Sequence, residues 1–152
     1  MKKTILTFAM AALCLNFCLA QDKQKASSSV NQPYKFDFSG FKSGYKSGYR
    51  ITDDEFMKGK SITVRNYTIT QLFALALGAG KHGIPADHII IDVREPGKLN
   101  QLKCYQLVVP FYLTDNFYII MQQSLHEEFP EYIVKMERRG TEYFMLIIDK
   151  EL

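Results

Sequence analysis

From residue 60 onward, apolar and polar positions recur with the periods of regular secondary structure. Apolar and polar residues alternate in the segment 61–66 (SITVRN), which predicts a strand with one buried face. The segment 69–80 (ITQLFALALGAG) is apolar on nearly every side and predicts a short helix capped by Asn66 or Thr68. Because an isolated helix of this length is marginal in water, we expect it to be buried against a sheet and to end at its glycines.

Further elements follow along the chain. The segment 114–129, capped by Thr114 or Asp115, predicts an amphipathic helix with one apolar face. That face carries Tyr118, Met121, Leu125 and Phe129. The segment 88–93 (HIIIDV) is apolar on both sides and predicts a central strand. Three more strands are predicted at 104–110, 132–139 and 142–148.

The resulting order, β-α-β-β-α-β-β, predicts an α+β fold. We expect two tandem β-α-β-type units, with a mixed sheet and both helices packed on one face of it.

The glycines that follow the first predicted helix do not form a phosphate-binding loop. Such a loop precedes a helix, so that free backbone N–H groups and the positive end of the helix dipole face the phosphate. Here the glycines come after the helix, and His82 stands where a magnesium-binding Ser or Thr is needed. The sequence therefore argues against a nucleotide site in this loop.

The N-terminal region predicts two segments outside this domain. Residues 1–20 combine a basic start, an apolar run and a final alanine, which predicts a cleaved signal peptide and export to the periplasm or the extracellular space. Residues 21–50 are rich in polar residues, glycine and aromatics, which predicts a flexible linker. A single domain then spans 51–152. We expect no stable membrane span after signal cleavage, because no further apolar run is long enough.

The charge and cysteine content of the mature chain narrow the possible functions. Without Lys2 and Lys3 the chain has 17 basic against 16 acidic residues. This near-neutral balance argues against nucleic acid as a partner. Of the three cysteines only Cys104 remains after cleavage, so no intramolecular disulfide can form.

No group of residues meets the spacing rules of a catalytic or metal site. The HEE triplet that starts at His126 lacks the second histidine of the helical zinc signature, because Pro130 holds that position. Cys104 could serve as a nucleophile with His82 or His88 as its base. Its place in an apolar strand favours a buried, inert thiol instead. We therefore predict no catalytic residue, no metal and no cofactor.

The binding candidates lie in two loops. The segment 38–50 (FSGFKSGYKSGYR) repeats Lys-Ser-Gly beside aromatic residues. Tyr45 and Tyr49 in it are candidates for contact with a sugar or polymer. Lys81 and His82 lie in a glycine-flanked loop and are candidates for binding an anion.

Three segments carry a family resemblance: "ITVRNYTITQLFALALG", "IIIDVREPGKL" and "MQQSLHEEFPEYIVKMERRGTEYFMLII". The matching positions are Asn66, Thr68, Leu72, Ala76, Leu125, Phe129, Arg138 and Arg139. From about residue 60 to 148 the chain resembles the secreted bacterial "soil-associated protein" domain family, whose function is unknown. The triplet HEE stands where the family usually has an acidic residue and an arginine. The first strand and helix are also similar, more weakly, to the short N-terminal domain of secretins and TonB-dependent receptors.

The resemblance implies an extracytoplasmic accessory or sensory module and identifies no ligand. Together with the residues, it predicts an exported, non-catalytic binding or accessory domain of the bacterial cell envelope. Its partner would be an envelope protein or a cell-wall ligand. Two alternatives remain open: a small envelope enzyme that uses Cys104 with a histidine, and a structural component that self-assembles through the hairpin after Arg139.

Overall fold

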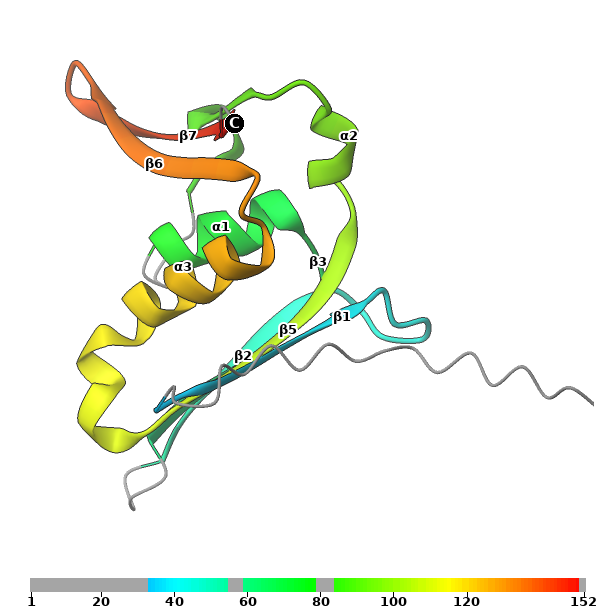
Figure 1. Cartoon of the computed structure of the whole chain (residues 1–152), viewed down its shortest axis with the longest axis vertical. Coiled ribbons are helices and arrows are strands. Elements are labelled where there is room, and N and C mark those ends of the chain that lie inside the picture. Colours follow the sequence, from blue (N-terminus) through cyan, green and yellow to red (C-terminus); the bar gives the residue numbers. More distant parts are fainter. Residues whose placement is uncertain (1–32, 55–58, 79–83, 151–152) are drawn as a thin grey trace, which may run out of the picture.

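The apolar helix α1 (Ile69–Leu77) lies between two β-sheets, at the centre of the fold (Figure 1). The structure is a computed structural model that describes residues 33–54, 59–78 and 84–150. The five consecutive helix residues 72–76 are all buried. Five consecutive positions of an α-helix point in every direction around its axis. The helix is therefore covered on all sides, as its uniformly apolar sequence requires.

Thr68 caps this helix through a reciprocal pair of hydrogen bonds. The Gln71 N–H donates to Thr68 Oγ1 (3.1 Å), and the Thr68 N–H donates to Gln71 Oε1 (2.9 Å). The helix ends at Gly78, whose N–H donates to the Ala74 carbonyl oxygen (2.9 Å). Thr68, one of the two expected caps, and Gly78, one of the expected stops, are thereby confirmed.

A four-stranded antiparallel sheet covers one side of the helices. Its order is β1-β5-β3-β2. The strands are β1 (Lys35–Gly40), β2 (Gly48–Asp54), β3 (Gly59–Thr68) and β5 (Leu102–Val109). Phe36, Ile62 and Leu107 stand in register on the inner face and are buried. This face forms the floor of the hydrophobic core.

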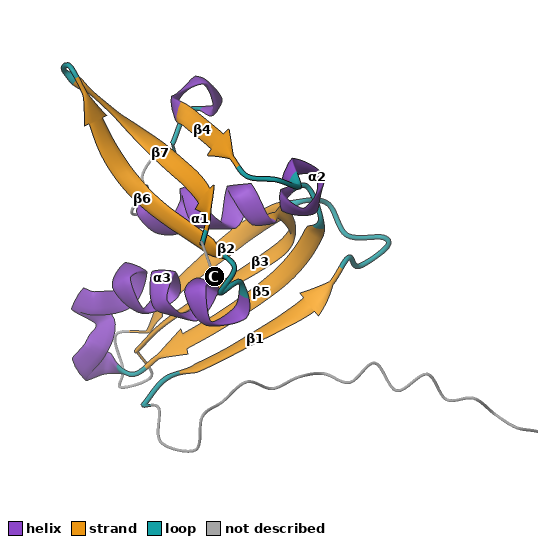
Figure 2. Cartoon of the chain, turned by 45° about the horizontal axis from the view of Figure 1, so that its top comes forward, coloured by secondary structure: helices purple, strands orange, loops and turns teal. Residues whose placement is uncertain are grey.

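A three-stranded sheet covers the other side of the helices, as Figure 2 shows. It consists of β4 (Ile89–Asp92), β6 (Tyr132–Arg139) and β7 (Glu142–Asp149), in the order β4-β7-β6. β4 is parallel to β7, whereas β6 and β7 form an antiparallel hairpin. Val134, Met145 and Ile147 from this sheet are buried in the same core as α1.

The second long helix, α3 (Phe117–Glu128), packs beside α1 (Figure 1). Met121, Leu125 and Phe129 are buried as expected, and Tyr118 is half-buried. The expected start of α3 is wrong. A 3₁₀ segment, Phe111–Asn116, precedes it, and the Thr114 hydroxyl donates to the Phe111 carbonyl oxygen inside that segment. Thr114 and Asp115 therefore do not cap α3.

From β3 onward the order of strands and long helices follows the prediction, with short helical segments added between them. The one-turn helix α2 (Pro96–Leu99) and a 3₁₀ turn (Ala86–His88) flank β4. The α+β class is confirmed. The expected single mixed sheet is wrong, because β3 and β4 belong to different sheets. A helix that is apolar all round needs a cover on each side, and one sheet cannot supply both.

Two further expectations are also wrong. The segment 21–50 was expected to be a linker, yet Lys35–Gly40 and Gly48–Asp54 form the two edge strands of the larger sheet. β4 is an edge strand rather than a central one, and Ile91 is 42% exposed. Among the residues that the structure describes, no helix has both the length and the apolar character needed to cross a membrane. The expected signal peptide, residues 1–20, lies outside the described residues.

A buried polar contact joins the larger sheet to α3. The Tyr105 hydroxyl lies 2.6 Å from Ser124 Oγ, and Ser124 itself donates to the Met121 carbonyl oxygen (2.8 Å). Because the Ser124 proton is already used, Tyr105 is the donor in this contact. Burial raises the pKa of the Tyr105 hydroxyl well above its ordinary value.

The raised pKa of Tyr105 predicts a loss of stability in alkali. An unfolded tyrosine ionises near pH 10, whereas the folded core retains the neutral hydroxyl. The free energy of unfolding should therefore be unaffected by Tyr105 below pH ~10 and should fall as the pH rises above that value. We expect Tyr105→Phe to reduce this alkaline slope in urea titrations between pH 9 and 11. The exposed Tyr143→Phe is the control, and an equal slope in both variants would contradict the prediction.

Gly59 is a second position that the fold depends on. It has a φ of 81°, and a Cβ there would overlap the Val109 carbonyl oxygen. Gly44 has nearly the same φ, 82°, but a Cβ there meets nothing within 4 Å. We expect Gly44→Ala to cost about 1 kcal/mol of unfolding free energy, since only the backbone is strained. Gly59→Ala should cost at least about 3 kcal/mol, because β3 must also move away from β5. Equal losses in thermal unfolding would refute this packing argument.

Candidate functional site

The connection between β1 and β2 is held by one buried side chain, that of Asn66. Its Oδ1 accepts from the Lys42 N–H (2.9 Å), and its Nδ2 donates to the carbonyl oxygens of Lys42 (2.9 Å) and Tyr45 (2.7 Å). The Ser47 hydroxyl donates to the Asn66 carbonyl oxygen (2.9 Å). Asn66 is only 2% exposed. The loop is thus fixed at three residues by hydrogen bonds to a group removed from water.

A β-bulge in β3 makes this arrangement possible. The register of β3 with β5 shifts between Val64 and Tyr67, and Asn66 between them has a left-handed φ of 51°. Asparagine tolerates this conformation better than most residues with a side chain. The sequence predicts Asn66 as one of two possible helix caps and as a position of the family pattern, but not as an anchor for this loop. The sequence feature that could have indicated the anchoring role is a polar residue, Asn66, at the end of an alternating strand and two positions before the actual cap, Thr68.

The anchored loop presents aromatic side chains to solvent. Tyr45 is 53% exposed, and the Arg65 guanidinium lies 4.7 Å from the centre of its ring, in a cation–π contact. Tyr49 lies on the edge strand β2, is 44% exposed and meets the Tyr67 ring edge-to-face at 6.3 Å. Both tyrosines predicted to bind a ligand are therefore exposed and braced by a neighbouring side chain.

The other predicted binding residues, Lys81 and His82, lie outside the described residues. Cys104, for which the sequence favours an inert thiol over a nucleophile, is 5% exposed. Its Sγ lies 3.5 Å from both the backbone nitrogen and Oδ1 of Asn66. Its possible base His88 ends the 3₁₀ turn that leads into β4 of the other sheet. The His88 ring lies 4.8 Å from that of Phe144, and its Nε2 lies 3.8 Å from Glu142. The fold does not bring Cys104 and His88 together as a pair.

The third histidine, His126, is engaged in packing. Its Nδ1 lies 2.8 Å from the Gln122 carbonyl oxygen, and its ring meets that of Phe73 edge-to-face. Within the described ranges, no three His, Cys, Asp or Glu side chains gather in a way that could hold a metal ion.

Two open depressions lie beside the anchored loop, on the outer face of the larger sheet. Their volumes are about 460 and 310 Å³, and Thr63 and Arg65 line both of them. The first is also lined by Lys46, Gly48, Tyr49, Arg50 and Thr52, and the second by Asp37, Ser39, Lys42, Val64, Cys104, Tyr105 and Gln106. Four cationic side chains and one carboxylate thus share this surface.

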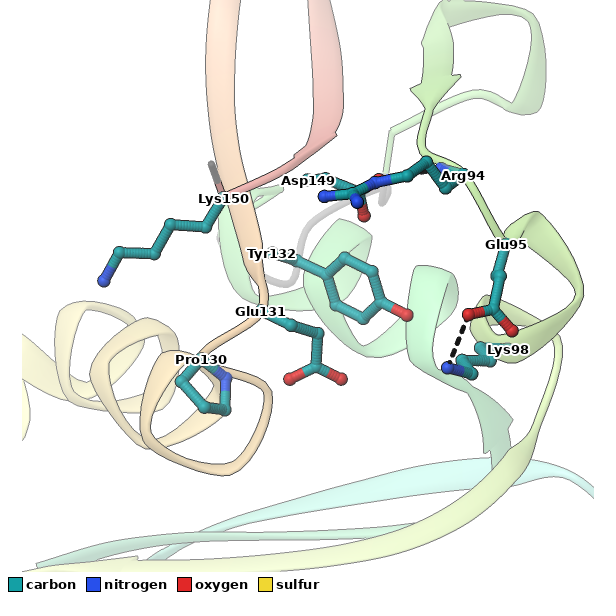
Figure 3. Close-up of a pocket in the computed structure, with 8 residues that line it drawn as sticks. All are labelled: Arg94, Glu95, Lys98, Pro130, Glu131, Tyr132, Asp149 and Lys150. Atoms are coloured by element: carbon teal, nitrogen blue, oxygen red, sulfur yellow. Dashed lines mark hydrogen bonds and ion pairs between the residues drawn. The ribbon is translucent and has the colours of Figure 1, made fainter. Parts of the chain in front are cut away.

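A third depression, of about 430 Å³, lies where β6, β7 and α2 approach one another (Figure 3). The buried Tyr132 ring stands in its centre, with charged side chains around it. Most of these charges are already paired. Arg94 donates to Asp149 through its N–H (2.8 Å) and its Nε (3.2 Å), and Lys98 donates to Glu95 (2.9 Å).

These pairs also shift the acid–base equilibria at the rim of the third depression. The hydrogen bond from the Arg94 backbone is the main cause that lowers the pKa of Asp149, and the bond to Glu95 raises the pKa of Lys98. Both shifts favour the charged, paired forms. The third depression is therefore less suited than the first two to attract a charged ligand.

Comparison with protein-family models finds no match for this chain, and comparison with curated proteins and with solved structures finds none either. The family resemblance drawn from the sequence therefore stays a prediction.

The role of Asn66 can be tested with an isosteric change. In Asn66→Asp a carboxylate oxygen replaces Nδ2 and faces the carbonyl oxygens of Lys42 and Tyr45 without a proton between them. We expect a loss of about 2–4 kcal/mol of unfolding free energy in urea titrations at pH 7. Asn66→Gly is the control, because it relieves the backbone while removing the side-chain bonds, and it should lose less. A stability of Asn66→Asp within about 0.5 kcal/mol of the wild type would refute the anchoring role.

Proposed function

We propose that this protein is an exported, non-catalytic binding domain of the bacterial cell envelope. Its contact surface is the tyrosine–arginine surface, formed by Tyr45, Lys46, Arg50 and Arg65. Tyr49 pairs with the buried Val64 and therefore points to the helix side of the sheet, outside this surface. One observation carries the proposal: Asn66 fixes the loop that bears Tyr45, so that an aromatic side chain stays exposed in a defined position.

A pre-ordered loop suits a binding surface because a flexible loop must lose conformational entropy when it binds. A loop of Gly, Ser and Lys loses conformational freedom when it binds, and this loss weakens affinity. Here the buried hydrogen bonds of Asn66 have already ordered the loop during folding. The exposed Tyr45 and the neighbouring cations then meet a partner with little further loss. Exposed aromatic and arginine side chains are also the residue types that dominate binding surfaces.

Two further features support export and a binding role. Residues 1–20 have the pattern of a signal peptide. Cys104 is buried, so it is shielded from the oxidising conditions outside the cytoplasm. Its partner Asn66 belongs to the loop anchor, which favours a structural role for the thiol over a catalytic one.

Chemical crosslinking in the native envelope tests the proposal. The mature chain, residues 21–152, would be crosslinked in its own cell-envelope fraction and recovered with its partners. We expect a specific partner whose recovery falls about tenfold with Tyr45→Ala, because the most exposed ring of the surface is lost. Tyr143→Ala is the matched control, since Tyr143 is 56% exposed and lies on the distant β6–β7 hairpin.

Two outcomes would count against a binding role for this surface. One is a partner recovered equally well with both tyrosine variants. The other is the recovery of no partner by chains whose circular dichroism shows them to be folded.

A further inference from the structure

The outer face of the larger sheet combines positive charge with open access. Alternation along the strands directs Phe36, Ile62 and Leu107 to the core, so their neighbours point outward. The cross-strand register places one outward row across all four strands: Asp37, Gln106, Thr63 and Arg50. Both long helices lie on the opposite side of this sheet (Figure 1). Among the described residues, no helix or strand covers the outer face.

Positive charge is concentrated on this face although the chain as a whole is nearly neutral. Lys42, Lys46, Arg50 and Arg65 line its two depressions, against the single carboxylate of Asp37. The cations of this face take no part in the ion pairs Lys60–Asp53, His88–Glu142, Arg94–Asp149, Lys98–Glu95 and Arg139–Glu137. The local excess of positive charge attracts an anionic ligand.

The shape of the surface suits an extended ligand. The two depressions adjoin each other through Thr63 and Arg65, which line both. A ligand that filled both would run across neighbouring strands. Neutral hydrogen-bonding groups stand between the cations: the hydroxyls of Ser39, Thr52 and Thr63 and the amide of Gln106. These groups match the hydroxyls of a sugar, whereas guanidinium groups match carboxylates in a bidentate geometry.

We propose that this basic face binds an acidic polysaccharide, a chain of sugars that carry carboxylates. Arg50 and Arg65 would hold carboxylates, Thr52 and Thr63 would hydrogen-bond to sugar hydroxyls, and the exposed Tyr45 ring would contact a sugar face. The inference rests on the proposed binding function and names its ligand class. The alternation of cations with neutral hydroxyls favours such a polymer over nucleic acid, which selects for a denser basic surface.

The inference is tested by measuring the affinity of the mature chain for three probes. The probes are alginate as a polyuronate, dextran as a neutral polysaccharide, and single-stranded DNA as a polyanion without uronic acids. We expect alginate to bind, dextran to bind at least about tenfold more weakly, and DNA to bind more weakly than alginate at 0.15 M salt. The alginate affinity should fall with added salt, because ionic contacts contribute to it.

A pair of double variants locates the site. Lys46→Gln with Arg50→Gln removes two charges from the basic face, and we expect alginate affinity to fall at least about tenfold. Lys135→Gln with Arg138→Gln removes the same charge from β6 in the other sheet and should leave the affinity within about twofold. Circular dichroism confirms that both variants are folded.

Three results would overturn the inference: no binding of alginate by the wild type, DNA binding as tight as that of alginate, or equal losses in the two double variants. Failure here is distinguishable from failure of the proposed function. A crosslinked partner that depends on Tyr45, found together with no alginate binding, would leave the binding domain in place and refute only the acidic polysaccharide.

Discussion

Burial of α1 between two sheets is the constraint on which the rest of the structure depends. Its residues 72–76 are all covered, so no single layer of structure can shield it from water. The larger sheet covers one side, α3 lies beside it, and the smaller sheet closes the other side. Burial of an apolar side chain contributes roughly 1.5–3 kcal/mol. The loss of either sheet would thus expose several such groups at once.

Among the described residues, each sheet keeps one face that no helix or strand covers, and these two faces differ in chemistry. The outer face of the larger sheet is polar and basic, with Arg50 and Thr63 in register across β2 and β3. On the smaller sheet the side chains opposite the core include Ile133 and Ile148, which face each other across β6 and β7. An anionic ligand would therefore distinguish the two faces by their charge.

The sequence was sufficient to predict the elements whose patterns are local. The strand before α1, the cap at Thr68 and the apolar face of α3 all follow from periodicity and capping rules. β1 and β2 were missed because glycine and serine around 39–48 outweighed a short alternation, in which Phe36 and Phe38 flank a polar residue. The division into two sheets depends on long-range packing around α1. The local pattern of apolar and polar residues does not show which strands pair with each other.

The candidate site was predictable only in part, for a similar reason. Tyr45 and Tyr49 stood out by residue type, but the order of the loop that carries Tyr45 depends on Asn66, which is 21 positions from Tyr45 in the chain. The bulge at Asn66 also shifts the register of β3 with β5 just before Thr68 caps α1. One short segment thus sets both the entry into the central helix and the position of the surface loop. Formation of the core and ordering of the contact surface are therefore coupled, so the conformational entropy of the loop is lost on folding and no longer opposes binding.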